Sequence, residues 1–226
     1  YKRLTDPNNS WRTSTRYWGI NPTQTGTSCF LRSLYLMRIV CLISGGGTNL
    51  KALIDWQAND LLGGARIVAV ISNTAAALGL ERADNAEIPT KVLSHHDFPN
   101  RSAFDHALIE FIDTYEPDLI VLAGFMLVLS KDFVTHYDRR LINIHPSLLP
   151  KYKGLNTHKR ALEAGDNYTG ATVHWVTSEV DAGDIIRQVE VPIMGEDTEE
   201  TLKARVLDAE HTLYPSVIRD LSLGLI

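Results

Sequence analysis

Buried strands and amphipathic helices alternate along most of the chain. Short runs rich in Val, Ile and Leu have the length of strands, and apolar residues recur at helical spacing between them. The strand patterns lie at 38–44, 65–72, 90–93 and 119–123, and the helical patterns at 50–61, 80–86 and 102–115. Near-continuous apolar strands separated by helices are typical of a parallel sheet that is covered on both faces. The sequence therefore predicts an α/β fold, with an open, mostly parallel sheet and helices on both faces.

The pattern changes after a fifth predicted strand at 141–144. Residues 171–177 and 185–191 alternate apolar and polar side chains, and Gly183 lies in the connection between them. Alternation of this kind is typical of antiparallel strands with one solvated face. The sequence therefore predicts an antiparallel hairpin that is appended to the parallel sheet.

A last helix is expected near the end of the chain. Asp197, followed three residues later by Glu200, resembles a capping arrangement, and apolar residues then repeat at helical spacing. Pro215 is expected to end or kink this helix. No further strand pattern precedes Ile226. We therefore expect residues 37–226 to form one domain, and a truncated C-terminus is one interpretation of this ending.

Residues 1–36 differ in composition from the rest of the chain. They contain five basic residues and one acidic residue, Asp6, and show no sustained helical or strand period. A polar segment of this kind is typical of disorder. An Arg-rich segment with few acids also resembles an organelle transit peptide, although Pro7 and Pro22 interrupt any amphipathic helix. We interpret residues 1–36 as a disordered or non-native extension, with a targeting segment as the alternative.

The composition excludes several classes of protein. The 226 residues include 27 acidic and 22 basic side chains, for a formal net charge of −5. Nucleic-acid phosphates need a positive surface, so a basic nucleic-acid-binding protein is excluded. No run of 18 apolar residues predicts a membrane span. The two cysteines, Cys29 and Cys41, form neither a disulfide framework nor a zinc pattern. We expect a cytoplasmic monomer or homodimer that binds no nucleic acid, no membrane and no metal.

A glycine-rich turn is expected where the first strand meets the first helix. It has the sequence SGGGTN over residues 44–49. At such a turn, backbone N–H groups and the positive end of the helix dipole converge on an anion. Leu50 replaces the third glycine of the dinucleotide fingerprint, Asn73 follows the second strand in place of an acid, and a Walker lysine is absent. These features favour a phosphate monoester over NAD or ATP, and a turn without a ligand is the alternative.

The fifth predicted strand ends in the sequence NIHPSLLP. Asn143 and His145 lie two residues apart, so in an extended strand their side chains point to the same face. Pro146 makes the chain leave the sheet at its carboxyl edge, where open α/β sheets bind ligands. An amide donor beside an imidazole suits a carbonyl group that becomes an oxyanion. A structural histidine that caps the strand is the alternative.

Asp181 lies in the predicted hairpin connection. Turn chemistry alone explains an Asp and a Gly there. A carboxylate near His145 would raise the imidazole pKa and fix the ring, but sequence spacing does not establish that proximity. His158 is interpreted as a solvated loop residue, with a functional residue as the alternative. The remaining histidines lack metal-ligand spacing and are interpreted as core or solvated residues: His95, His96, His106, His136 and His174.

Four motifs together resemble the formyltransferase family that uses 10-formyltetrahydrofolate. They are SGGGTN at 44–49, AGFM at 123–126, NIHPSLLPKYKG at 143–154 and EVDAGD at 179–184. One of them alone would be weak, whereas four in this order are highly specific. The resemblance extends from Met37 to about Leu221. It implies an open α/β sheet with the folate in a cleft at the carboxyl edge.

The resemblance also implies a reaction and a set of site residues. Its formyl donor would be 10-formyltetrahydrofolate, its acceptor the amine of glycinamide ribonucleotide, and its pathway purine biosynthesis, without a metal. The implied catalytic residues are Asn143, His145 and Asp181. The implied ribonucleotide-binding residues are Gly47, Thr48 and Asn49 at the phosphate, Glu210 at the glycinamide end, and Leu207, Asp208 and Ala209. The implied folate-binding residues are Arg101, Met126, Leu127, Val128, Leu129, Asn143, Thr177, Ser178, Glu179, Val180 and Asp181.

Two positions depart from the family's pattern. Leu127 stands where the family usually has Arg, and Asn156 where it usually has the first His of a GLHTH run. Both are expected near the folate, so these departures bear on its affinity more than on the chemistry. Two other functions are compatible with the same motifs, namely a formyltetrahydrofolate deformylase, which transfers the formyl group to water, and a non-catalytic ligand-binding relative.

Overall fold

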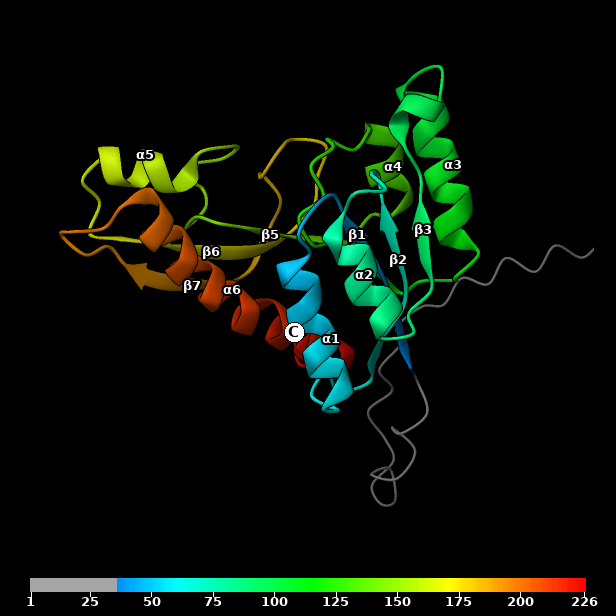
Figure 1. Cartoon of the computed structure of the whole chain (residues 1–226), viewed down its shortest axis with the longest axis horizontal. Coiled ribbons are helices and arrows are strands. Elements are labelled where there is room, and N and C mark those ends of the chain that lie inside the picture. Colours follow the sequence, from blue (N-terminus) through cyan, green and yellow to red (C-terminus); the bar gives the residue numbers. More distant parts are fainter. Residues whose placement is uncertain (1–35) are drawn as a thin grey trace, which may run out of the picture. The chain divides into compact units, whose positions relative to one another are not determined.

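A computed structural model describes residues 36–226 of the chain, which contain one seven-stranded sheet (Figure 1). The predictions for residues 1–35 lie outside the described residues. The strands are β1 (Met37–Ile43), β2 (Ala65–Ser72), β3 (Thr90–Val92), β4 (Leu119–Leu122), β5 (Leu141–His145), β6 (Tyr168–Trp175) and β7 (Ile185–Pro192). Their order in the sheet is β3-β2-β1-β4-β5-β6-β7.

Four long or medium helices and three shorter ones connect these strands. They are α1 (Thr48–Ala58), α2 (Leu78–Asn85), the 3-10 helix η1 (His95–Asp97), α3 (Arg101–Asp113), α4 (Lys131–His136), α5 (Thr157–Glu163) and α6 (Glu199–Ser222). The sequence pattern does not predict η1, α4 or α5, because each is at most about two turns long and shows no helical period of apolar residues. None of the helices within residues 36–226 is long and apolar enough to cross a membrane.

The sheet has a parallel part and an antiparallel part, as predicted. Strands β3, β2, β1, β4 and β5 pair in parallel, whereas β6 pairs antiparallel with both β5 and β7. The chain builds outward from β1 to β3 on one side and then returns to place β4 on the other side of β1. This reversal makes the carboxyl ends of β1 and β4 a topological switch point, where open α/β sheets bind ligands.

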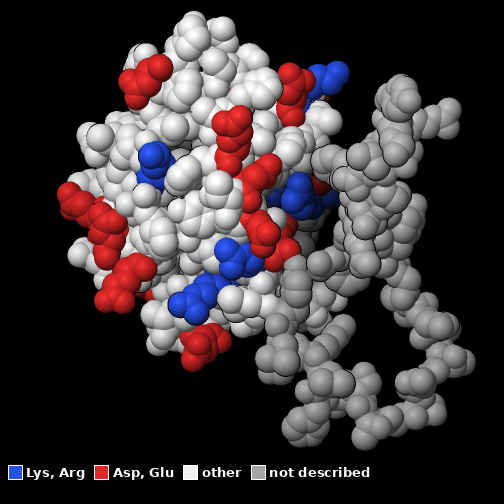
Figure 2. Space-filling view, turned by 90° about the vertical axis from the view of Figure 1, so that its right-hand side faces the viewer, with Lys and Arg blue, Asp and Glu red and all other residues white. Residues whose placement is uncertain are grey.

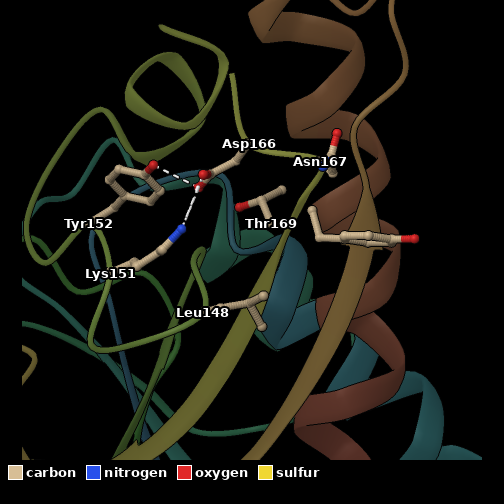
Figure 3. Close-up of a pocket in the computed structure, with 7 residues that line it drawn as sticks. Leu148, Lys151, Tyr152, Asp166, Asn167 and Thr169 are labelled. Carbon is tan, nitrogen blue, oxygen red and sulfur yellow. Dashed lines mark hydrogen bonds and ion pairs between the residues drawn. The ribbon is translucent and has the colours of Figure 1, made fainter. Parts of the chain in front are cut away.

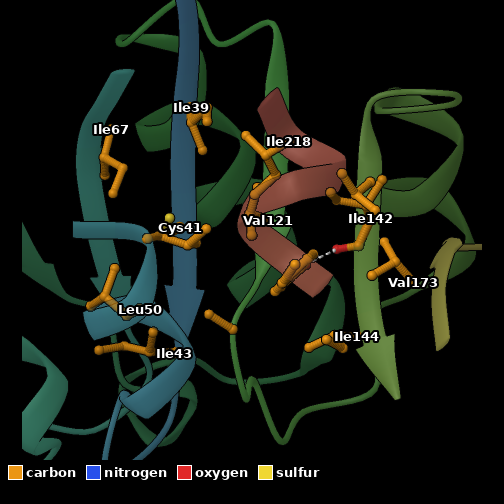
Figure 4. Close-up of a cluster of buried hydrophobic side chains, with 14 of the residues drawn as sticks. Ile39, Cys41, Ile43, Leu50, Ile67, Val121, Ile142, Ile144, Val173 and Ile218 are labelled. Atoms are coloured by element: carbon orange, nitrogen blue, oxygen red, sulfur yellow. Dashed lines mark hydrogen bonds between the residues drawn. The ribbon is translucent and has the colours of Figure 1, made fainter. Parts of the chain in front are cut away.

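The central strand β1 is buried on both faces. Ile39, Cys41 and Ile43 belong to a core shared with α1, α2 and α6 (Figure 4). Val40 and Leu42 face a second core with α3 and α4. This arrangement confirms the predicted fold class. Burial also raises the pKa of the Cys41 thiol to about 12, so the thiol stays protonated near neutral pH.

The charge distribution is mixed on the face that Figure 2 shows. There, acidic side chains are interspersed with basic ones, and no broad basic patch covers the described residues of that face. This distribution agrees with the excess of acidic residues in the sequence.

One of the two expected effects of Pro215, an end of helix α6, is wrong. The helix continues through Pro215 to Ser222 and does not end there. Val217 and Ile218 after the proline are fully buried, and the buried Tyr214 hydroxyl donates to the carbonyl oxygens of Leu122 and Ile142 at 3.0 and 3.1 Å. A proline removes one backbone donor, but contacts with the sheet on both sides of it outweigh that loss.

The start of α6 also differs from the prediction. Thr198 is the N-cap, and its side chain accepts from the N–H of Thr201 at 3.3 Å while the Thr201 hydroxyl accepts from the N–H of Thr198 at 3.0 Å. The capping box therefore joins Thr198 and Thr201, so the predicted arrangement of Asp197 with Glu200 is wrong. Asp197 instead accepts from the N–H of Met194 at 2.7 Å. Two threonines can make the same reciprocal contacts as the expected acid pair, one residue later.

The close approach of β6 and β7 at Gly170 yields a stability prediction. A Cβ atom there would lie 1.9 Å from the carbonyl oxygen of Val189, so Gly170→Ala must displace β7. We expect it to lower the free energy of unfolding by about 1–3 kcal/mol, measured by guanidinium denaturation. Gly195→Ala is the matched control, because a Cβ there meets no atom within 4 Å. Equal stability of the two variants would contradict this account of the hairpin.

Candidate active site

The glycine-rich turn after β1 lies at the switch point of the sheet. Gly47 has a φ of +63°, and a Cβ there would lie 2.6 Å from the Cα of Gly79, so only glycine fits. The Ser44 hydroxyl accepts from the N–H of Met126 at 2.8 Å, and the Ser44 N–H donates to the carbonyl of Gly124 at 3.1 Å. The turn is therefore joined directly to the segment that follows β4.

Two residues predicted to bind the ribonucleotide meet beside this turn. Asn49 lies in the first turn of α1, and its Nδ2 donates to Oε2 of Glu210, in α6, at 2.7 Å. Burial raises the pKa of Glu210 to about 7, although the hydrogen bond from Asn49 opposes this shift. Of the other residues predicted on α6, Asp208 is exposed, and Leu207 and Ala209 are half-buried.

The three predicted catalytic residues form one cluster at the end of β5. His145 Nδ1 lies 3.2 Å from Oδ2 of Asp181, and both side chains are almost fully buried. Asn143 Nδ2 lies 3.3 Å from Nε2 of His174, which is in turn 3.6 Å from Oδ1 of Asp181. The hairpin connection thus places Asp181 beside the two polar residues of β5, with His174 between Asn143 and Asp181.

Backbone groups from the bend after β5 complete the cluster. His145 Nε2 lies 2.9 Å from the carbonyl oxygen of Tyr152, and the N–H of Gly154 donates to Oδ2 of Asp181 at 2.9 Å. A carbonyl oxygen only accepts, so Nε2 of His145 carries a hydrogen in both protonation states. The titrating proton of His145 is therefore at Nδ1, which faces the Asp181 carboxylate.

The same contacts set the charge states of the pair. Burial lowers the pKa of the His145 imidazole, and the Tyr152 carbonyl and the Asp181 carboxylate only partly oppose that effect. Burial alone would raise the pKa of Asp181, but hydrogen bonds from His174 and Gly154 leave it below the usual value. A charged carboxylate thus lies beside an imidazole that loses its proton more readily than a solvated histidine does. This arrangement can hold a proton and pass it on.

His174 belongs to the cluster although the sequence analysis did not separate it from the other histidines. It is buried, as one of the two interpretations expected, but it contacts both Asn143 and Asp181. The antiparallel register pairs Asn143 with His174 and His145 with Thr172. Alternation in the ATVHWVT run would have indicated this face of β6, had the pairing of β6 with β5 been known.

His158 also differs from its predicted role. It is only 8% exposed in the first turn of α5, so the interpretation as a solvated loop residue is wrong. Its Nδ1 has no hydrogen-bond partner within the described residues. The segment expected to be a loop forms the short helix α5. Asn156 is the N-cap of this helix and lies in the left-handed region, with a φ of +58°.

The residues predicted to bind folate lie in two groups. In the first, Arg101 Nε lies 3.0 Å from Oδ1 of Asp105, whose Oδ2 accepts from the N–H of Ser130 at 3.0 Å. Met126 and Val128 of this group are exposed, Leu129 is buried, and Leu127 packs partly against the second core.

The second group is the loop from Thr177 to Asp181. Thr177, Ser178, Glu179 and Val180 are exposed, and Glu179 pairs with Lys153 at 3.1 Å. Within residues 36–226, no hydrogen bond or ion pair joins this loop to the first group. In the same part of the chain, no cluster of three His, Cys, Asp or Glu side chains is arranged to hold a metal ion.

Comparison with known proteins adds independent information. The formyl transferase family model matches residues 37–218. The chain is 54% identical over 183 residues to phosphoribosylglycinamide formyltransferase of Escherichia coli K12, which covers 80% of this chain and 85% of that protein. It is also 48% identical over 189 residues to the trifunctional purine biosynthetic protein adenosine-3 of Bos taurus. That match covers 84% of this chain but only 19% of the longer bovine protein.

Solved structures show the same similarity. Phosphoribosylglycinamide formyltransferase from Coxiella burnetii superimposes with a TM-score of 0.81 and 53% identity, over 84% of this chain and 89% of that one. Glycinamide ribonucleotide transformylase 1 from Symbiobacterium toebii superimposes with a TM-score of 0.81 and 43% identity, over the same shares of the two chains. These matches confirm the resemblance that the four motifs indicated, and the chain belongs to the formyl transferase family.

Proposed function

We propose that this protein transfers the formyl group of 10-formyltetrahydrofolate to the amine of glycinamide ribonucleotide in purine biosynthesis. One observation carries the proposal: Asn143, His145 and Asp181 lie together in a chain that is 54% identical to the Escherichia coli enzyme named for this reaction. Three of the relatives named above are called formyltransferases or transformylases, so we prefer transfer to the ribonucleotide over the deformylase and binding-protein alternatives. A cytoplasmic location and a monomer or homodimer stay predictions.

The proposed chemistry begins with attack of the substrate's neutral amine on the formyl carbon. Negative charge then develops on the formyl oxygen. The Asn143 amide donates a hydrogen bond to this oxygen, and the positive charge of the protonated His145 imidazole stabilises it. Asp181 assists removal of the amine proton through an ordered water. The bond from the formyl carbon to N10 of the folate then breaks. N10 takes up a proton, and tetrahydrofolate is released. Binding both substrates side by side supplies much of the remaining acceleration.

Substrate binding follows from the positions of the other residues. We place the phosphate of the ribonucleotide at Gly47, Thr48 and Asn49, because they lie at the N-terminus of the 11-residue helix α1. Glu210 would receive the glycinamide end, beside Asn49. We place the folate between two segments. One is Met126 to Leu129, in which Met126 and Val128 are exposed, together with Arg101, and the other is the loop from Thr177 to Asp181.

A direct assay tests the proposed reaction. The protein is incubated with 10-formyltetrahydrofolate in the presence and absence of glycinamide ribonucleotide, and loss of the formyl group from the folate is followed. We expect loss only with the ribonucleotide, because its amine is the nucleophile. Equal loss in its absence would identify a hydrolase, and no loss in either case a non-catalytic protein.

Replacing the imidazole tests the catalytic cluster. We expect His145→Ala to lower kcat by about a hundredfold or more, the usual effect of removing one group that stabilises an oxyanion. His96→Ala is the matched control, because His96 is exposed in η1. Steady-state rates with both substrates provide the measurement. A kcat for His145→Ala close to that of the control would refute the assignment.

The unusual pKa of Glu210 yields a prediction on stability. Its folded-state pKa of about 7 lies above the usual 4.5, so the folded state binds more protons between these values. Wild-type stability attributable to this group therefore falls as the pH rises from 4.5 to about 7. Because Gln does not ionise, we expect Glu210→Gln to be more stable than the wild type by on the order of 3 kcal/mol near pH 8.5, and about equally stable near pH 4.

The same variant should bind its substrate less well. Loss of a charged acceptor for the glycinamide end should lower kcat/KM for the ribonucleotide by roughly tenfold or more. Denaturant unfolding at the two pH values and steady-state kinetics provide the two measurements. Glu163→Gln, an exposed carboxylate in α5, is the control for both. A Glu210→Gln protein with wild-type kinetics would remove Glu210 from the proposed site.

A further inference from the structure

The bend at residues 151–154 contacts both members of the His145–Asp181 pair through backbone atoms. The Tyr152 carbonyl faces Nε2 of His145, and the Gly154 N–H faces Oδ2 of Asp181, each at 2.9 Å. These backbone atoms stay in position only if the bend itself is held in place. Tyr152 itself has a φ of +56°, in the left-handed region, which costs a residue with a side chain about 1–2 kcal/mol. Other contacts must therefore hold the bend in place.

Asp166 holds the bend from the connection between α5 and β6. The Tyr152 hydroxyl donates to Oδ2 of Asp166 at 2.7 Å, and Lys151 Nζ lies 3.0 Å from each carboxylate oxygen. Figure 3 shows the side chains of Tyr152 and Lys151 both pointing toward this carboxylate. Hydrogen bonds from Tyr152 and Lys151 keep the pKa of Asp166 below its usual value, so the group is charged at neutral pH.

The surroundings of the Tyr152 ring increase the importance of this contact. The ring borders a cavity of about 430 Å³ that Leu148, Tyr168 and Thr169 also line (Figure 3). On that side, open space takes the place of close-packed side chains that would fix the ring. Arg160 lies over the ring at 5.1 Å and donates to the Lys153 carbonyl at 2.7 Å, which is a second restraint on the bend. The hydroxyl of Tyr152 is held by Asp166.

We propose that Asp166, acting through the hydroxyl of Tyr152, is a positioning residue for formyl transfer. It keeps the Tyr152 carbonyl and the Gly154 N–H aligned with His145 and Asp181. This inference rests on the proposed function, but the effect of Asp166 on His145 can be measured without an activity assay. Without the contact, the bend keeps only its other restraints, such as Arg160, so the imidazole acceptor and the carboxylate donor are held less precisely. The glycine-rich turn, on another loop, keeps its structure.

Titration of the His145 ring reports this alignment directly. The titratable and charged groups that face the ring are Asp181, His174, Arg160 and His158. All four are unchanged when Asp166 or Tyr152 is replaced. A carbonyl acceptor at Nε2 favours the protonated imidazole, so its loss should lower the pKa of His145.

The experiment compares four variants with the wild type in the full-length protein. Asp166→Ala and Tyr152→Phe remove the contact, and Asp166→Asn keeps an oxygen that accepts from the Tyr152 hydroxyl. Glu163→Gln is the control, because this nearby carboxylate is exposed and, among the described residues, forms an ion pair with Lys159 alone, at 3.8 Å. The measurements are kcat, KM for the ribonucleotide, and the NMR titration of the His145 ring.

We expect Asp166→Ala and Tyr152→Phe to lower kcat roughly tenfold, the scale of a small misplacement of reacting groups, while KM for the ribonucleotide stays unchanged. Both should also lower the NMR-measured pKa of His145. Asp166→Asn should recover most of the lost rate, and Glu163→Gln should match the wild type. If Asp166→Ala does not fold, Tyr152→Phe, which keeps the ring, decides the outcome.

Three results would overturn the proposal. The first is a wild-type kcat and an unchanged His145 titration in Tyr152→Phe. The second is an Asp166→Asn protein as slow as Asp166→Ala, because the route through the hydroxyl would then be wrong. The third is an equal loss of rate in Glu163→Gln, which would indicate a general effect of charge removal. If the wild type transfers no formyl group, the proposed function fails, whereas the NMR titration still decides whether Asp166 positions His145.

Discussion

The buried contact between His145 and Asp181 is the constraint on which the rest of the site depends. A carboxylate with a side chain only 10% exposed is tolerated only if other groups replace its lost water. Asp181 obtains these partners from three places: the imidazole at the end of β5, His174 in β6, and the N–H of Gly154 in the bend. The antiparallel pairing of β5 with β6 and the path of the bend must therefore both be correct before the charge can be buried. The same contacts therefore set the geometry of the candidate catalytic residues and stabilise this part of the fold.

Local patterns in the sequence predicted the parts of this arrangement that depend on near neighbours. Apolar runs identified the five parallel strands and alternation identified the two strands of the hairpin. The period of a strand also placed Asn143 and His145 on one face. Asp181 and His174 could not be placed that way, because their positions depend on which strand β6 pairs with and in which register. The short helix α5 and the burial of His158 also depend on packing. Pro215 is a further example, because it was expected to end or kink α6. The helix continues through it, since the residues around it pack against the sheet.

The Asn49–Glu210 pair shows why long-range burial is hard to read from a sequence. These residues are 161 positions apart, and neither carries a local signal that distinguishes it from a solvated polar residue. The resemblance to a family named both of them, but the physical reason for the choice appears only in the fold. The first turn of α1 and the middle of α6 pack over the same face of the sheet, so an amide reaches a buried carboxyl there. Burial raises the pKa of the Glu210 carboxyl group to about 7. Burying an ionisable group in this way is unfavourable for stability, so its position at the edge where ligands bind points to a function.

The switch point explains how two substrates can be brought together by so small a set of contacts. Strands β1 and β4 are adjacent and parallel, so the loops that follow them leave the same edge of the sheet side by side. The hydrogen bond from the Met126 N–H to the Ser44 hydroxyl ties these loops to each other. One loop is the proposed phosphate site and the other contributes to the proposed folate site, so this bond fixes the spacing between the two. Formyl transfer requires the amine and the formyl carbon to meet within bonding reach, and a rigid sheet edge sets that distance before either substrate arrives. The proposed catalytic cluster lies at the end of β5, the next strand along the same edge. The proposed substrate sites and the groups proposed to assist the reaction are therefore positioned by the same sheet.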